Sequence, residues 1–444
     1  MYKPSDLTFK GINKLAIPAI ITGIAEPLLS ITDTAIVGNV QINPLESLAA
    51  VGIAGSFIAA LIWILAQTRT AISATIGRYL GAKRLDEIMG LPAQIIVLNL
   101  GLSIVIYLVS VLFSNEIFTL YNAQGATLNY AVDYFNIRAL GFPLTLFVFS
   151  VFGVFRGLQN TFWPMLISIV GVVLNIGLDF LLVFGIEGML DPMHIEGAAW
   201  ASVISQCVMA LMAFVLMLRK TPFNFKVTFN FHPEIKNILK ISLNLIVRAI
   251  SLNVALIMAN AYATKYGDAY IAAQTIAFQI WLFFAFFIDG YASVGNIVSG
   301  KLKGENDYKR IWYLSGKLTR YSIIISLILV LVCTVGYNNI GALFTKEQEV
   351  RVLFKSIFWI VLIMQPINAL AFVFDGIFKG LAEAAILRNL LLIATFLGFV
   401  PTLLITDYFD LKLTGIWIAF TVWMMIRGGV LLVKFRSDYL VKNT

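Results

Sequence analysis

The sequence predicts an all-α polytopic membrane protein with about twelve transmembrane helices in two pseudo-symmetric six-helix bundles. Three observations lead to this prediction. The chain of 444 residues is 59% hydrophobic and only 13% charged, which is far more apolar than a soluble domain. Apolar runs of roughly twenty residues recur along the whole chain, and a helix needs that length to cross about 30 Å of hydrocarbon. Finally, the second half of the chain repeats glycine and proline positions of the first half.

The expected spans follow the apolar runs, because charged or turn-forming residues separate one run from the next. The runs at residues 95–113 and 390–405 carry no charge at all. The first run is too long, and too polar at its far end, for a signal peptide, so we expect the chain to be mature from Met1. The spans are predicted at residues 14–37, 51–77, 91–114, 131–157, 163–186, 197–218, 239–263, 269–300, 318–343, 354–381, 388–406 and 414–436.

Basic residues fall in every second connection between these spans. The connections at residues 38–50 and 187–196 hold none, although Lys346 and Arg351 are exceptions to the alternation. The positive-inside rule therefore predicts a multi-pass protein of a bacterial-type inner membrane with both termini in the cytoplasm. Because the net charge of +8 is spread in this way, we expect no nucleic-acid partner. The basic groups are Arg78, Lys83 and Arg84; Arg219, Lys220, Lys226, Lys236 and Lys240; and Lys301, Lys303, Lys309, Arg310 and Lys317.

The two halves of the chain form an internal repeat. The segment FPLTLFVFSVFGVFRGL at residues 142–158 aligns with QPINALAFVFDGIFKGL at residues 365–381, a shift of 223 (365 minus 142). Glycine is common in membrane helices, but five matches in one register make chance a poor explanation. The matched pairs are Gly77 and Gly300, Gly81 and Gly304, Pro143 and Pro366, Gly153 and Gly376, and Gly157 and Gly380.

The repeat divides the chain into two lobes. It spans six helices, an even number, so both halves enter the membrane from the same side and are related by an axis along the membrane normal. We predict an N-lobe at residues 1–218, a cytoplasmic linker at residues 219–240 and a C-lobe at residues 241–444. Two bundles that face one another leave a central cleft, which is the usual architecture of alternating access.

Five acidic residues lie at least four residues from either end of a predicted span: Glu26, Asp33, Asp179, Asp289 and Asp375. An ionisable side chain costs a few kcal/mol or more in hydrocarbon, so each of them marks a candidate functional site. Glu26 precedes Asp33 by seven residues and lies on roughly the same helix face, unless it sits at the membrane edge.

Asn175 and Asp179 form the strongest candidate site. Their i, i+4 spacing places both side chains on one helix face. Asp33 would add a second carboxylate and Ser202 a hydroxyl from other spans of the same lobe. Hard cations prefer such oxygen ligands, and two adjacent carboxylates in low dielectric hold a proton or a cation between them. The alternative is that these polar side chains only hydrogen-bond neighbouring helices.

These same residues carry a family resemblance. Pro18, the segment SITDTAIVGN around Asp33, LNIGLDFLLVFG around Asp179 and GAAWAS ending at Ser202 resemble the N-lobe cation-site pattern of multidrug-and-toxin-extrusion (MATE) transporters. The segments GRYLGAKR and FDGIFKGL are similar to those of the DNA-damage-inducible (DinF) branch. The resemblance covers essentially the whole chain and implies that Asp33, Asn175, Asp179 and Ser202 bind H+ or Na+. A sister branch has a carboxylate early in the seventh span, where this sequence has only Arg248 as a charge.

Asp289 and Asp375 each precede a glycine, which permits close helix approach. Arg248 is a candidate partner for either acid, because a buried acid and base neutralise one another. Both acids are therefore assigned either a structural ion pair or a place in the substrate cleft. The other cleft-lining candidates are aromatic, methionine and amide side chains, which suit varied organic cations, although each of them could equally pack between helices or face lipid. They are Trp63, Gln67, Met258, Asn260, Gln274, Gln279, Met364, Gln365, Asn368 and Trp423.

The sequence thus predicts a secondary antiporter that exports amphipathic or cationic organic compounds in exchange for H+ or Na+ by alternating access. Cation binding is expected to shift the first span, with bending near Pro18 or Pro27. We expect a monomer in the lipid bilayer that needs small-molecule substrates and no cofactor beyond the coupling ion. Exchange of one proton for one monovalent organic cation would move no net charge.

Two other classes of protein are alternatives to this one. A flippase of lipid-linked precursors would need a more basic cavity for pyrophosphate, whereas we expect the intramembrane charges of this chain to be mainly acidic. An intramembrane enzyme is not expected, because the sequence has no P-loop and no paired aspartate-rich loop, and His194 and His232 lie far apart outside the spans. Cys207 and Cys333 lie inside apolar runs, so neither a disulfide nor a zinc site is expected.

Overall fold

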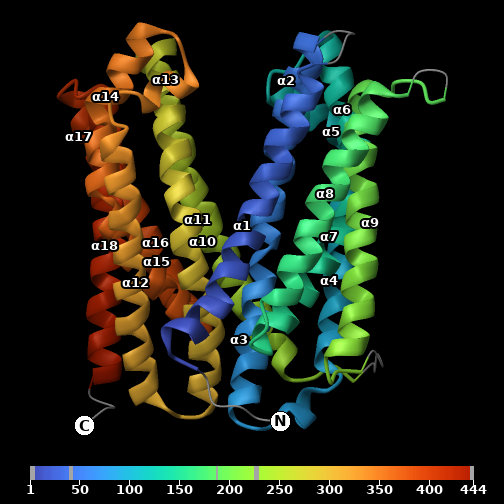
Figure 1. Cartoon of the computed structure of the whole chain (residues 1–444), viewed down its shortest axis with the longest axis vertical. Coiled ribbons are helices and arrows are strands. Elements are labelled where there is room, and N and C mark those ends of the chain that lie inside the picture. Colours follow the sequence, from blue (N-terminus) through green and yellow to red (C-terminus); the bar gives the residue numbers. More distant parts are fainter. Residues whose placement is uncertain (1–5, 40–43, 187–188, 225–229, 441–444) are drawn as a thin grey trace. The chain divides into compact units, whose positions relative to one another are not determined.

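The computed structural model describes residues 6–39, 44–186, 189–224 and 230–440. Helices make up nearly all of this part of the chain (Figure 1). Its extended structure is limited to an isolated bridge between Ile186 and Leu190. The predicted all-α fold class is therefore confirmed.

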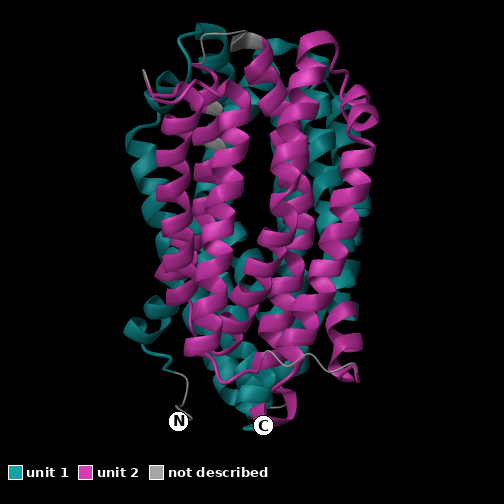
Figure 2. Cartoon of the chain, turned by 90° about the vertical axis from the view of Figure 1, so that its right-hand side faces the viewer, with its two compact units in different colours: residues 1–16, 77–83, 240–444 teal, residues 17–76, 84–239 magenta. Residues whose placement is uncertain are grey.

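The chain divides into two compact units (Figure 2). Unit 2 comprises residues 17–76 and 84–239, and unit 1 comprises residues 1–16, 77–83 and 240–444. The main boundary at residue 240 coincides with the end of the predicted linker. The two short segments at residues 1–16 and 77–83, which the sequence placed in the N-lobe, group with the C-terminal helices.

The helices of the first half of the chain are α1 (Phe9–Val37), α2 (Pro44–Leu65), α3 (Gln67–Gly81), η1 (Leu85–Ile88), α4 (Leu91–Leu112), α5 (Ser114–Leu120), α6 (Gly125–Ala139), α7 (Gly141–Gly157), α8 (Phe162–Phe184) and α9 (His194–Lys220). Those of the second half are α10 (Glu234–Tyr266), α11 (Asp268–Gly304), α12 (Tyr308–Val335), α13 (Ile340–Phe344), α14 (Gln348–Ile363), α15 (Gln365–Gly380), α16 (Ala384–Ile393), the π-helix η2 (Ala394–Phe399), α17 (Val400–Tyr408) and α18 (Lys412–Leu440).

Within the described residues, ten helical stretches are long and apolar enough to cross a membrane, and there are up to twelve if each of two bent pairs is one span. The bent pairs are α6 with α7, at 44°, and α14 with α15, at 50°. They correspond to the predicted spans at residues 131–157 and 354–381. The predicted number of spans is thus confirmed, and two of them are broken.

Proline explains why both spans break, and why they break at equivalent places. Pro143 lies in the first turn of α7, and Pro366 lies in the first turn of α15. Proline has no N–H to donate to the carbonyl four residues earlier, and its ring clashes with that carbonyl. The two prolines are one of the repeat pairs, so the repeat extends to the bends.

Glycines of the repeat make equivalent close contacts in the structure. A Cβ atom on Gly81 would collide with the carbonyl of Lys301, and one on Gly304 would collide with the carbonyl of Arg78. Residues 78 and 301 are themselves separated by 223 (301 minus 78). The two contacts, both inside unit 1, therefore relate α3 and α11 by a local two-fold.

The repeat pair Gly153 and Gly376 also makes equivalent close contacts, one in each unit. A Cβ atom on Gly153 would clash with the carbonyl of Arg69 in unit 2, and one on Gly376 would clash with the carbonyl of Ala292 in unit 1. The contacted residues also differ by 223 (292 minus 69). The internal repeat is therefore a repeat of helix packing as well as of sequence.

The surface of the helices is apolar. Leu211, Leu331 and Val433, for example, have exposed fractions of 63%, 65% and 67%. A water-soluble protein rarely exposes so many large apolar side chains in contiguous areas. We interpret these faces as the lipid-facing surface of a membrane protein.

Candidate functional site

The four residues of the predicted cation site come from three helices of unit 2. Asp33 lies on α1, Asn175 and Asp179 lie one turn apart on α8, and Ser202 lies on α9. All four are buried, with exposed fractions of 3%, 1%, 0% and 4% respectively. The close approach of α9 to α8 depends on Gly197, where a Cβ atom would lie 2.7 Å from the carbonyl oxygen of Leu182.

Hydrogen bonds connect these side chains. The hydroxyl of Ser202 donates to Asp33 Oδ2 at 3.3 Å. The amide of Asn175 is oriented with its nitrogen toward Asp33, to whose Oδ1 it donates at 3.2 Å, while its oxygen accepts from the backbone N–H of Ser202 at 3.3 Å. Asp33 therefore receives one donor from α8 and one from α9.

The carboxyl groups of Asp33 and Asp179 lie within hydrogen-bonding reach of each other. The Oδ1 atom of Asp179 is buried and has no hydrogen-bond partner elsewhere in the described chain. Two ionised carboxylates cannot donate to one another, and a buried acceptor without a partner is costly. The pair therefore suits a shared proton or a bound cation, either of which satisfies that oxygen.

Two residues of the site were missed by the sequence reasoning. Tyr134 on α6 is buried and hydrogen-bonds to Arg138, one turn further along the same helix. Arg138 is close enough to act electrostatically on both Asp33 and Asp179. The signal in the sequence was Arg138 itself, but Arg156 lies in the same predicted span at residues 131–157, and the sequence does not distinguish the two.

The two prolines proposed as hinges lie within α1, which continues through Pro18 and Pro27. Neither proline can donate to the carbonyl four residues earlier, which weakens the helix locally. The division between the compact units falls between Ala16 and Ile17, next to Pro18. The side chain of Glu26 lies outside the described residues.

Asp375 and Asp289 have different environments in unit 1. Asp375 is buried and pairs through Oδ1 with Arg248 at 2.6 Å and through Oδ2 with Lys379 at 2.7 Å. Asp289 is exposed. The ion pair considered for Arg248 therefore forms with Asp375.

The candidate cleft residues also divide into two groups. Met364, Gln274, Gln365, Asn368 and Trp423 are buried, with exposed fractions of at most 1%. The amide of Asn368 donates to Gln365 Oε1 at 3.0 Å. Met258 and Gln67 are half-buried, whereas Trp63, Asn260 and Gln279 are exposed. The structure thus brings the first group into the interior of unit 1 and leaves the exposed residues on helix surfaces.

Comparisons with known proteins identify the family of the chain. The chain matches the MatE family over residues 18–181 and 245–427. It is 27% identical to the DNA damage-inducible protein F of Escherichia coli, over 97% of this chain and 92% of that protein. It is 28% identical to Protein DETOXIFICATION 42 of Arabidopsis thaliana, but over 67% of this chain and only 56% of that longer protein.

The fold is similar to that of solved transporters. A MATE crystal structure in the bent conformation superposes with a TM-score of 0.90 at 22% identity, over 97% of this chain and 96% of the other. The family match covers both halves of the internal repeat and includes Asp33, Asn175 and Asp179. The chain therefore belongs to the MATE family of multidrug and toxin efflux transporters.

Proposed function

We propose that this transporter is an antiporter, which exports amphipathic organic compounds in exchange for H+ or Na+. The observation that supports the proposal most strongly is the convergence of Asp33 and Asp179 in one buried site. Carboxylate, amide and hydroxyl oxygens surround the point where the two acids meet, and these are suitable ligands for Na+. The same carboxylates can instead hold a proton.

Arg138 sets the charge of this site. Two ionised carboxylates and one guanidinium carry a net charge of −1, so one bound monovalent cation neutralises the group. A second cation would leave a net positive charge in low dielectric, which is unfavourable. We therefore propose a single coupling ion per cycle.

Coupling to the rest of the cycle runs through α1. Asp33 is the contribution of α1 to the site, whereas Asn175 and Asp179 belong to α8. A bound cation holds the two acids together, and their repulsion after its release favours movement of α1, which is weakened at Pro18 and Pro27. Coupling requires that the cation and the substrate prefer different conformations, since a ligand shifts an equilibrium only by its differential affinity.

Efflux from proteoliposomes tests this proposal. A fluorescent amphipathic dye is loaded, and its efflux is followed under a pH gradient and, separately, under a Na+ gradient. We expect Asp33→Asn and Asp179→Asn each to reduce gradient-driven efflux at least tenfold. Asp191→Asn, which changes an exposed carboxylate beyond α8, is the matched control and should retain efflux.

Gradient-driven efflux that survives both substitutions would refute the role of these residues. A wild-type protein that responds to neither gradient would favour the flippase class instead. The acidic character of the spans argues less strongly against that class than the sequence suggested, because Arg138 and Arg427 add buried or half-buried cations to them.

A further inference from the structure

Among the described residues of unit 1, buried cations outnumber buried acids. Asp375 has both of its carboxylate oxygens engaged, Oδ1 by Arg248 and Oδ2 by Lys379. Arg427 on α18 is a third cation that acts electrostatically with Asp375 and Arg248. One carboxylate cannot neutralise three cations, so this cluster carries an excess of positive charge.

Arg427 lacks an ionic partner of its own within the described residues. Its exposed fraction is 2%. Its Nη1 atom donates to the sulfur of Met424 at 3.1 Å, which is a weak acceptor, and its Nη2 atom is buried with no hydrogen-bond partner in the described chain. An unneutralised guanidinium inside a membrane span is expensive and marks a functional site whose partner must be an anion.

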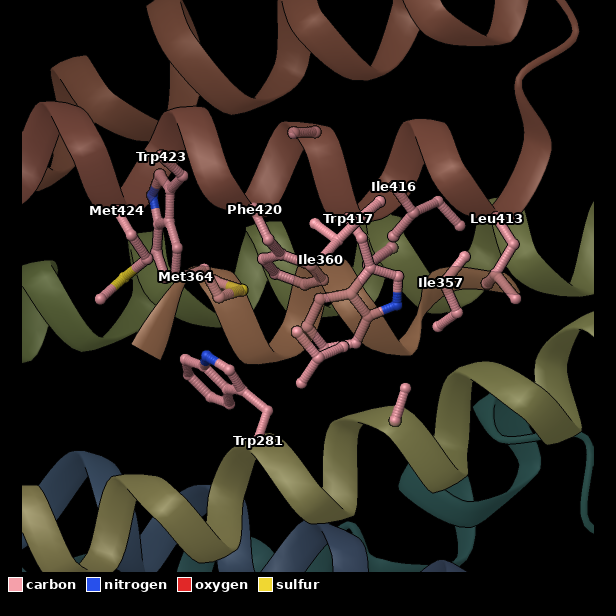
Figure 3. Close-up of a cluster of buried hydrophobic side chains, with 14 of the residues drawn as sticks. Trp281, Ile357, Ile360, Met364, Leu413, Ile416, Trp417, Phe420, Trp423 and Met424 are labelled. Atoms are coloured by element: carbon pink, nitrogen blue, oxygen red, sulfur yellow. The ribbon is translucent and has the colours of Figure 1, made fainter. Parts of the chain in front are cut away.

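Aromatic rings flank this guanidinium. Its central carbon lies 4.6 Å from the ring centroid of Trp423 and 5.7 Å from that of Phe372. The ring of Phe372 also contacts Trp281, at 6.2 Å between centroids, and the buried indole N–H of Trp281 has no hydrogen-bond partner in the described part of the chain. Figure 3 shows Trp423 and Trp281 among the apolar side chains of this core.

The backbone beside Trp423 is also irregular. The indole N–H of Trp423 donates at 3.1 Å to the hydroxyl of Thr395, which lies in the π-helix η2 (Ala394–Phe399). Single π-helical turns inside α-helices occur frequently at functional sites, because they re-aim side chains. Trp423 is thus held in place by a polar contact, one turn before Arg427 on α18.

We propose that Arg427 binds the carboxylate of an amphipathic organic monoanion, whose apolar body packs against Trp423 and Phe372. A planar guanidinium with Nη2 free and Nη1 on a weak acceptor matches the two oxygens of a carboxylate. Among the buried groups of the cluster Asp375 neutralises Arg248, and Arg427 leaves one excess positive charge, because the side chain of Lys379 is 18% exposed. A pyrophosphate carries more negative charge than this single buried excess can balance. Because Arg427 is buried in this conformation, the anion reaches it in another conformation of the cycle. The inference rests on the proposed function in that it names the charge of the exported compound.

Equilibrium binding tests this inference without any ion gradient. The purified chain in lipid nanodiscs is titrated by calorimetry with benzoate, with the neutral benzamide and with the cationic benzylamine. We expect benzoate to bind at least tenfold more tightly than either of the other two. Arg427→Gln should weaken benzoate binding at least tenfold, whereas Arg436→Gln, at an exposed position of the same helix, should leave it unchanged.

Three results would overturn the inference: equal binding of benzoate and benzamide, undiminished benzoate binding by Arg427→Gln, or tighter binding of geranyl pyrophosphate than of benzoate. If Arg427→Gln does not yield a monodisperse protein, benzoate binding by Arg427→Lys provides the test instead. It keeps the charge but loses the planar pair of donors, so benzoate binding should weaken several-fold, and unchanged binding would contradict the proposal. Asp33→Asn separates the two proposals, because it should abolish gradient-driven efflux and preserve benzoate binding.

Discussion

The acid site of unit 2 and the cationic cluster of unit 1 are built on the same repeated scaffold and have opposite charge. At the shift of 223, Asn175 and Asp179 align with Gly398 and Thr402 (398 minus 175), and Asp375 aligns with Phe152 (375 minus 152). The glycine contacts and the proline bends recur in both halves, and Lys379 has a basic equivalent in Arg156 (379 minus 156). The other charged groups do not recur, because Asp33, Asp375 and Arg427 align with Leu256, Phe152 and Ile204. Packing therefore defines the repeat, whereas each half has acquired its own ionic site. The acid site of unit 2 is therefore suited to bind a coupling cation, and the cationic cluster of unit 1 is suited to bind an anionic group.

The largest expected effect concerns membrane potential. Entry of one cation against exit of one organic monoanion moves two positive charges inward, whereas exchange of one cation for another moves none. At about 2.3 kcal/mol per charge per 100 mV, two charges supply about 4.6 kcal/mol, or roughly a thousandfold gradient. We therefore expect benzoate efflux from proteoliposomes to accelerate strongly under an interior-negative potassium–valinomycin potential. Potential-independent benzoate efflux would remove the contrast between the two regions.

Neutralising Arg138 should change the number of coupling ions. Without this guanidinium the ionised pair Asp33 and Asp179 carries a charge of −2, so Arg138→Gln should bind two monovalent cations where the wild type binds one. The measurement is the cation-to-substrate ratio from the reversal potential of transport in proteoliposomes. An unchanged ratio in a folded Arg138→Gln protein would assign that arginine a structural role.

The repeated glycine contacts lead to a prediction about stability, with a smaller expected effect. Gly81→Ala and Gly304→Ala should each destabilise the protein by about 1–3 kcal/mol, because the added methyl group meets a backbone carbonyl. The two effects should be similar in size, since the contacts are related by the repeat. A Cβ atom added at Gly316 on α12 would meet nothing within 4 Å, so Gly316→Ala should be neutral or stabilise by up to about 1 kcal/mol. Thermal unfolding in detergent measures all three; a harmless Gly81→Ala would contradict the packing account.

Much of the fold follows from the sequence by simple physics. The length and spacing of the apolar runs predict the spans, and the repeated glycines predict equivalent helix contacts. The two broken spans were predicted as continuous, although Pro143 and Pro366 were visible as a repeat pair. Proline near a helix end permits either a kink or a break, and the packing of neighbouring helices determines which occurs.

The candidate site was only partly accessible from the sequence. The i, i+4 spacing places Asn175 and Asp179 together on one helix, but the approach of Asp33 and Ser202 depends on the packing of α1 and α9. Arg138 is one of several basic residues inside the predicted spans, so only the folded structure identifies it as the one that lies near both acids. The choice of Asp375 over Asp289 as the partner of Arg248 depends on helix rotation, and the hydrophobic pattern of a buried helix does not specify rotation.

Cation binding to the purified chain tests the central claim most directly. Proton uptake on acidification and binding of radioactive Na+ are measured per chain, for the wild type and for the double variant Asp33→Asn with Asp179→Asn. The account predicts one cation per wild-type chain at the site and none in the double variant, with benzoate binding retained in both. A double variant that still takes up that cation would contradict the account.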